Sequence, residues 1–161
     1  MRRLAVLLAC GALLQGTSPA WAALEISTDQ RPLAFGVMRL GEAKELAQLG
    51  AYHNEITCTS TNGHSWYLKI SALQPLTSGP DAIPLDNFQW QLAWTNGLGT
   101  APAPYQMSPM SLIPSLVYVS GPNEAQGEAI RVQLKYLLTI PEAQSSGVYH
   151  TTIQLTLTEI L

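Results

Sequence analysis

The residues best suited to chemistry lie together in the stretch ITCTSTNGHSWYLKIS, residues 56–71. Cys58 and His64 are both potential metal ligands, and they flank a turn across which they could approach each other. A structural zinc site needs four ligands, however, and no further one lies in this stretch. A reactive thiol would need neighbours that lower its pKa, and the threonines and serines around Cys58 do not provide them. A solvated turn histidine beside a buried cysteine is the simpler expectation, although a two-ligand start of a metal site stays open.

Elsewhere the sequence shows no catalytic constellation. His53, His64 and His150 are far apart, and none has a short metal-ligand spacing to Cys, Asp or Glu. Asp81 and Asp86 lie in a connecting segment and are expected to be solvated rather than a paired acid and base. The chain has no G-x-S-x-G, phosphate-binding, H-E-x-x-H or calcium-loop motif, and only 12% of its residues are charged. We expect a protein that is not an enzyme and has no catalytic residue, metal site or cofactor.

The first residues are typical of a secretory signal peptide. Two arginines precede an apolar core from Leu4 to Leu14, and residues 20–22, Ala-Trp-Ala, form a small-x-small cleavage site. The apolar run is too short for a membrane-spanning helix of about 20 residues. We therefore expect a signal peptide at 1–22 and one exported domain at 23–161, located in the periplasm, on the cell surface or outside the cell.

The cysteine count depends on this cleavage. If Cys10 leaves with the signal peptide, only Cys58 remains, so no internal disulfide is possible and Cys58 is expected to be a small buried core residue. An alternative is a lipoprotein processing site in which Cys10 is acylated. Arg3 lies too close to Cys10 to leave a full apolar region, which favours the cleaved signal.

The net charge argues against a nucleic-acid partner. The full chain carries −3, and the predicted mature chain is more acidic because Arg2 and Arg3 leave with the signal peptide. Phosphate binding needs a clustered basic face, whereas the remaining basic residues are scattered along the chain.

Alternation with a period of two dominates the predicted mature chain. The clearest strand covers 130–140, and a threonine-rich strand at 148–158 is expected to pair with it as a hairpin. A segment at 40–49 could form two helical turns, a polar loop or an irregular edge. Further candidate strands are 23–28, 33–38, 53–61, 65–73, 88–95 and 115–119. About eight short strands separated by Gly, Pro and Asn predict an all-β fold, an antiparallel β-sandwich.

The stretch 56–71 fits this pattern as a β-hairpin. Asn62-Gly63 supplies turn residues, while Cys58 and Trp66 are expected to point into the core. In 88–95, the even spacing of Trp90 and Trp94 also favours the core over a binding surface.

The segment from Gly97 to Pro114 has four prolines and no clear period. It is too long for an ordinary connection in a compact domain, which indicates a mobile segment or a functional loop. Tyr105, Met107 and Met110 either form an exposed apolar contact surface or fold back to cover an open end of the sandwich.

Three motifs in order give the chain a family resemblance. LAFG at 33–36, ITCTSTNG at 56–63 and GVYHTTIQLTLT at 147–158 resemble the secreted spore coat protein U family, whose domain also builds archaic chaperone–usher pili. The resemblance implies an immunoglobulin-like β-sandwich of seven to eight strands that polymerises by donor-strand complementation. It makes residues 23–28 the donor strand, with Leu24 and Ile26 as its alternating apolar side chains. The implied partners are other subunits, through β-strand addition, and a periplasmic chaperone.

These expectations lead to two hypotheses about function. The first is a non-enzymatic structural or adhesive component of the bacterial surface, a pilus subunit or pilin-like protein of a fimbrium. The alternative is a self-contained secreted or periplasmic binding module, which holds a glycan or peptide with the Gly97 to Pro114 loop and the nearby Trp90 and Trp94.

Overall fold

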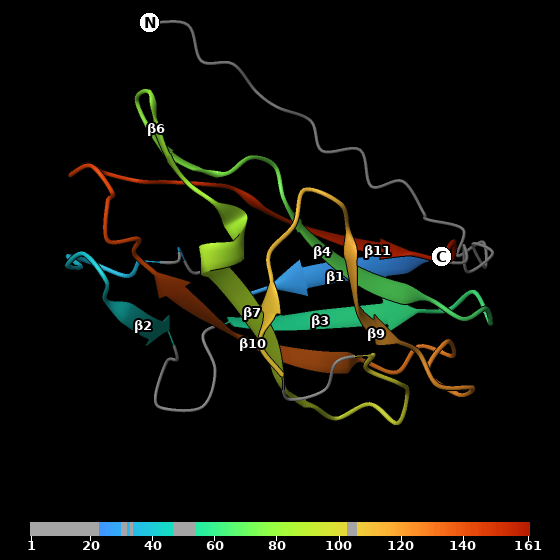
Figure 1. The fold of residues 1–161 in the computed structure, drawn as a ribbon. Helices are drawn as coiled ribbons and strands as arrows, with labels where there is room; N and C mark the ends of the chain where they lie inside the picture. Colours follow the sequence, from blue (N-terminus) through green and yellow to red (C-terminus); the bar gives the residue numbers. More distant parts are fainter. Residues whose placement is uncertain (1–22, 30–31, 33, 47–53, 103–105) are drawn as a thin grey trace, which may run out of the picture.

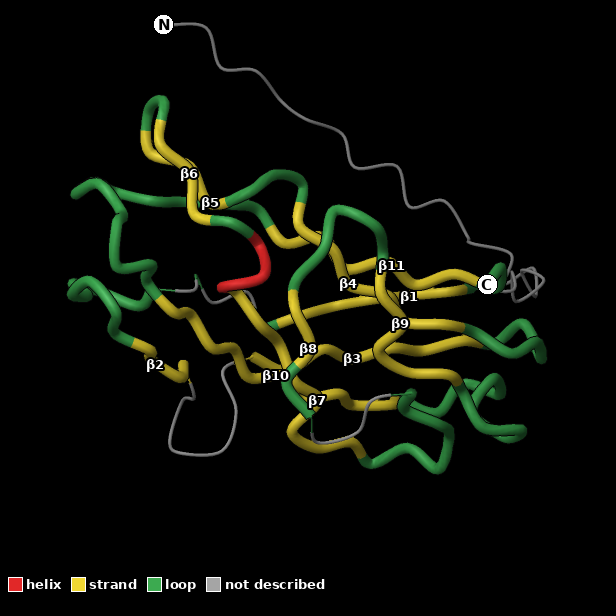
Figure 2. The backbone as a smooth tube through the Cα atoms, viewed as in Figure 1, coloured by secondary structure: helices red, strands yellow, loops and turns green. Residues whose placement is uncertain are grey.

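The computed structural model describes residues 23–29, 32, 34–46, 54–102 and 106–161 (Figure 1). The predicted signal peptide at 1–22 lies outside these ranges. The described chain is all-β, with antiparallel strands and a single 3-10 turn, η1, at Leu85–Asn87. Two sheets enclose one core, so the prediction of an all-β sandwich is confirmed. Most of the longer connecting segments gather at the two ends of the sandwich (Figure 2).

The larger sheet has six strands, and the main path through it runs β1-β3-β10-β7-β8. Its bounds are β1 Leu24–Thr28, β3 Asn54–Ser60, β10 Ile130–Thr139, β7 Phe88–Thr95 and β8 Ser108–Pro109. The sixth strand, β2 at Ala43–Leu46, pairs with the second half of β10, whereas β3 pairs with the first half. β10 is therefore the central strand of this sheet.

The smaller sheets complete the fold. The order β11-β4-β9 joins β11 Ile153–Thr158, β4 Tyr67–Ala72 and β9 Ser115–Val119. A two-stranded hairpin, β5 Leu76–Ser78 with β6 Asp81–Ile83, projects at the top of Figure 1.

Both hairpins expected from the sequence are wrong in their pairing. β3 belongs to the six-stranded sheet and β4 to the three-stranded sheet, so residues 61–66 cross between sheets. β10 and β11 are likewise in different sheets, and β11 pairs with β4 along its whole length. Alternation identifies the apolar face of each strand, but two such faces can meet across the core as well as side by side in one sheet. The predicted burial of Cys58 and Trp66 is confirmed, since both are completely buried.

Two local expectations also change. The described part of 40–49 contains β2 rather than a helix, with Leu46 opposite Tyr136 and Lys44 opposite Leu138. Within 33–38, the described residues contain no strand. They form an irregular segment that packs Phe35 and Met38 against the core.

The core lies between the two sheets. Phe88 stacks on Tyr136 with ring centroids 5.9 Å apart, and Trp66 packs on Tyr118 at 5.6 Å. The largest fully buried side chains are Trp66, Tyr118, Tyr136, Phe88, Ile56, Leu68, Ile70, Ile83, Leu92, Met110, Ile130 and Leu134.

A β-bulge in β7 corrects the prediction for Trp94. Trp90 and Leu92 are buried as expected, but Trp94 is 45% exposed. Leu92 pairs with Leu134 and Trp94 pairs with Gln133, so Ala93 is an extra residue in β7. The extra residue shifts the alternation, as bulges do, and Trp94 lies on the outer face of the sheet with Gln133.

Candidate functional site: an apolar groove beside a free strand edge

A groove of about 1240 Å³ opens between the six-stranded sheet and the β11 side of the sandwich. Phe88, Tyr136 and Leu138 contribute to it from β7 and β10, because the alternation of these strands points those side chains inward. The opposite lining comes from the smaller sheets, through Leu76, Ile83, Ile153 and Leu155, and residues 34–40 complete it. Most of this lining is apolar, as in sites that bind apolar side chains.

The chain before β11 extends one wall of the groove. The backbone of His150 exchanges two hydrogen bonds with Thr77 of β5, with N–O distances of 3.0 and 3.1 Å. The Leu73 amide donates to the Thr152 carbonyl at 2.9 Å. Residues 150–158 therefore follow β5 and β4 as one long, irregular ribbon beside the groove.

β11 has a free edge in the described chain. All six of its residues pair with β4, and no other described strand pairs with it. An edge strand presents backbone N–H and C=O groups that can accept another strand. Here that edge lies next to an apolar groove, which is the combination that β-strand addition requires.

Ile26 shows that the sandwich is uncovered along this side. It pairs with Cys58, so it points toward the interior, yet 40% of its surface is exposed. β1 and β11 lie close to each other, but the two belong to different sheets and do not pair. An inward-facing side chain is exposed because no described strand covers the gap between these two edges.

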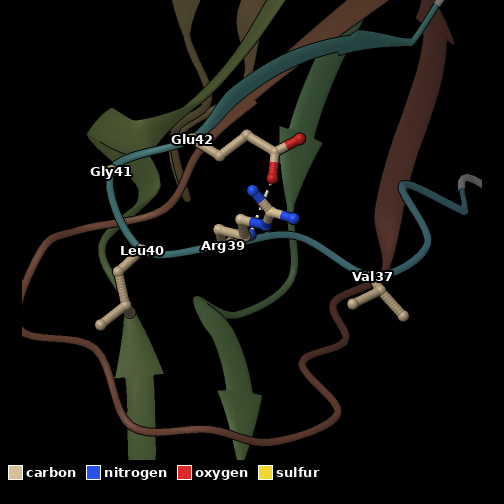
Figure 3. A pocket seen from close by; sticks show the side chains of 5 residues that line it. All are labelled: Val37, Arg39, Leu40, Gly41 and Glu42. Atoms are coloured by element: carbon tan, nitrogen blue, oxygen red, sulfur yellow. Dashed lines mark hydrogen bonds between the residues drawn. The ribbon is translucent and has the colours of Figure 1, made fainter.

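The rim of the groove carries exposed apolar side chains. Val37 is 97% exposed, and Leu40 and Val148 are also exposed. Figure 3 shows Arg39 and Glu42 turned toward each other, with the Val37 and Leu40 side chains directed away from that pair. The Arg39 amide donates to Glu42 Oε2 at 2.7 Å and fixes this rim loop. Exposed apolar groups around an apolar groove indicate an interaction surface.

Three polar residues of the groove lining bond to one another. The Tyr136 hydroxyl donates to Asn54 Oδ1 at 3.0 Å, and Asn54 Nδ2 donates to Thr28 Oγ1 at 3.3 Å. Burial raises the pKa of Tyr136, so its hydroxyl stays neutral. Tyr136, Asn54 and Thr28 therefore form one hydrogen-bonded set in the lining.

The structure separates the predicted contact residues. Met110 is only 2% exposed, and its amide donates to the Phe88 carbonyl at 2.7 Å, so its proposed place on an exposed surface is wrong. Met107 is half-buried, and Tyr105 lies outside the described residues. Met110 instead packs into the core.

The predicted donor residues lie in β1, which pairs with β3 of the same chain over all five of its residues. Leu24 is half-buried against the core, and Ile26 lies in the uncovered gap. They flank the side on which β11 is free.

The stretch around Cys58 does not form a chemical centre in the described chain. His64 is exposed, whereas Cys58 is buried, and burial raises the pKa of its thiol to about 12. No group of three His, Cys, Asp or Glu side chains within the described ranges could hold a metal ion. His53 lies outside those ranges.

Sequence reasoning missed the groove because it assigned two of the rim residues, Val37 and Val148, to candidate strands at 33–38 and 148–158. Val37, Leu40 and Val148 lie in irregular segments, each next to a glycine. An isolated apolar residue beside a glycine was the local sequence signal that could have indicated this rim. The groove itself depends on which strands face each other.

Comparisons with known proteins add no relative. No protein-family model matches the chain, and no curated protein is significantly similar to it. In the part of the chain that the structure describes, no helix has the length and apolar character needed to cross a membrane.

Proposed function

We propose that the protein is a non-enzymatic structural or adhesive component of the bacterial surface, a pilin-like subunit that associates by β-strand addition. The observation that carries the proposal is the free edge of β11 beside the apolar groove. A strand from another subunit would pair with β11 and place alternate side chains beside Ile153 and Leu155 of the groove lining. Backbone hydrogen bonds would supply affinity, and the groove would select the side chains.

The strand order supports an immunoglobulin-like interpretation of this edge. In that fold, strands A, B, E and D form one sheet and C, F and G form the other. If β1, β3, β10 and β7 correspond to A, B, E and D, then β4 and β11 correspond to C and F. The position of G is next to β11, where the described chain has no strand. The proposed partner strand would take that position.

The donor in this proposal is β1 of a second copy, with Leu24 and Ile26 as its apolar side chains. β1 is an edge strand, and its ladder is formed with β3 alone. In the oligomer, β1 would give up its ladder with β3 and form a new one with β11 of the next copy, so both arrangements contain one ladder to this strand. The resemblance of residues 33–36, 56–63 and 147–158 to the spore coat protein U family supports the same assembly, with a periplasmic chaperone as a further expected partner.

Association of the purified protein tests this proposal. We expect concentration-dependent oligomers in sedimentation velocity, and we expect a synthetic peptide with the sequence of residues 23–29 to bind and to reduce oligomer formation. A chain that stays monomeric at all concentrations and does not bind the peptide would contradict strand addition.

Rim variants locate the interface. Val37→Asp and Val148→Asp should weaken association without unfolding, because both side chains are exposed in the monomer. Leu98→Asp is the matched control, since Leu98 is 92% exposed and does not line the groove. An equal effect of Leu98→Asp would show that any added charge dissociates the oligomer, and would remove the groove from the explanation.

A further inference from the structure

A second surface lies on the outer face of the six-stranded sheet, around Trp94. The bulge at Ala93 places this indole among polar side chains, whereas regular pairing would put Trp94 opposite Val132 and inside the core. Bulges often redirect a side chain at a functional position. A large exposed aromatic surface is therefore built into the strand.

Trp94 begins a row of side chains that crosses three strands. Trp94 pairs with Gln133, and Gln133 pairs with Glu55. Because neighbouring strands are about 4.8 Å apart, the row is about 10 Å long at the backbone. We define this set, Trp94, Gln133 and Glu55, as the Trp94 row.

The polar members of the row are held in place. Gln133 Nε2 donates to Glu55 Oε2 at 2.8 Å, and Arg131 Nε lies 3.9 Å from Glu55 Oε1. These interactions fix a planar amide and a carboxylate beside the indole. The side chains that surround the row on the sheet, Gln91, Lys135 and Thr57, are polar and partly exposed.

We propose that the Trp94 row binds a saccharide, with one sugar ring stacked on the indole. A pyranose ring has a face of C–H groups and a rim of hydroxyl groups. The C–H face matches the apolar indole surface, while the hydroxyls match the donors and acceptors of Gln133 and Glu55. The length of the row suits one or two rings.

Other ligand classes fit this surface less well. The Glu55 carboxylate and the net charge of −3 disfavour a nucleic acid, despite the exposed indole. A protein interface usually excludes charge from its centre, whereas ion pairs Arg131–Glu55 and Lys135–Glu45 lie on this face. A saccharide tolerates both features because its hydroxyls bond to charged and neutral groups.

An array of immobilised oligosaccharides tests this inference with the wild-type protein, and each sugar that binds is then titrated in solution. Trp94→Ala should reduce affinity at least tenfold, and Gln133→Ala should reduce it several-fold. Leu98→Ala is the control for removal of an exposed apolar side chain elsewhere, and it should leave affinity unchanged. Tryptophan fluorescence should change on binding, because Trp66 and Trp90 are buried and Trp94 is exposed.

Two results would overturn the inference: no sugar on the array is bound by the wild-type protein, or Trp94→Ala and Gln133→Ala bind as tightly as wild type. Circular dichroism checks folding, and the Gln133→Ala variant, at a partly exposed position, decides the matter if Trp94→Ala unfolds. A Trp94-dependent change in oligomer mass without sugar binding would assign the face to a protein contact instead. Val148→Asp should retain sugar binding, which separates this site from the proposed subunit groove.

Discussion

The Tyr118 hydroxyl donates to the Glu124 carboxylate inside the core, 2.9 Å from Oε1 and 2.8 Å from Oε2. The backbone amides of Leu98, Gly99 and Gly121 also donate to this carboxylate. These bonds distribute the buried charge over several donors and join the segment after β7 to the connection between β9 and β10. The start of the proline-containing loop is thus fixed by a buried carboxylate.

The Glu124 carboxylate should therefore be essential for stability. Glu124→Ala leaves the Tyr118 hydroxyl and the Leu98 and Gly121 amides without this acceptor, which is expected to lower the free energy of unfolding by about 3 kcal/mol or more. Urea denaturation followed by circular dichroism measures this change. Glu128→Ala is the control, because Glu128 is exposed and its loss should change stability by less than about 0.5 kcal/mol. Equal stability of the two variants would contradict the role of the buried carboxylate.

Gly99 should tolerate no side chain. A Cβ atom there would lie 2.0 Å from the Val119 carbonyl oxygen and 2.6 Å from the Tyr118 hydroxyl. Gly99→Ala must therefore move backbone, and we expect a loss of about 3 kcal/mol or more in urea denaturation. At Gly63, a Cβ would meet open space and only the positive φ of 74° opposes alanine, so Gly63→Ala should cost about 1–2 kcal/mol. The reverse order of the two losses would contradict the close approach at Gly99.

Sequence patterns predicted the strands better than their partners. Alternation located β10 and the burial of Cys58 and Trp66, because a strand with one buried face must alternate. The same pattern is compatible with hairpins and with crossings between sheets, so the pairing of β3 and β10 with their successors was wrong. Trp94 was placed in the core because an inserted residue such as Ala93 has no distinctive sequence signal.

The candidate site was less predictable than the fold for the same reason. The groove is formed by segments distant in sequence, such as residues 34–40 and 144–152, which meet only after the sheets pack. Glu124 was also missed, because a single glutamate in a polar connection is usually solvated. Its role depends on three amides and a tyrosine that the fold brings to it.

Cys58 should be unreactive in the folded protein. Its thiol is completely buried and its pKa is raised to about 12, so both access and thiolate population are low near pH 8. In a chain of residues 23–161, a thiol-specific chromogenic disulfide should label no cysteine without denaturant and one cysteine in urea. Rapid labelling of the folded protein would show that the core around Cys58 opens readily, in contrast to the packed structure.

The same thiol predicts a loss of stability at alkaline pH. The pKa of Cys58 rises from 9.0 to about 12 through burial, so between these values the unfolded chain releases a proton that the folded chain retains. The unfolded state then binds fewer protons, and the free energy of unfolding must fall as the pH rises.

Burial also raises the pKa values of the Tyr118 and Tyr136 hydroxyls, and the hydrogen bond to Glu124 raises that of Tyr118 further. These two groups therefore lower the free energy of unfolding only above about pH 10. Urea midpoints measured under reducing conditions should therefore be constant from pH 7 to 8 and decrease from pH 9 upward. Cys58→Ala should delay the decrease to above pH 10, where the two tyrosines act. An identical decrease from pH 9 in Cys58→Ala would show that the thiol does not cause it.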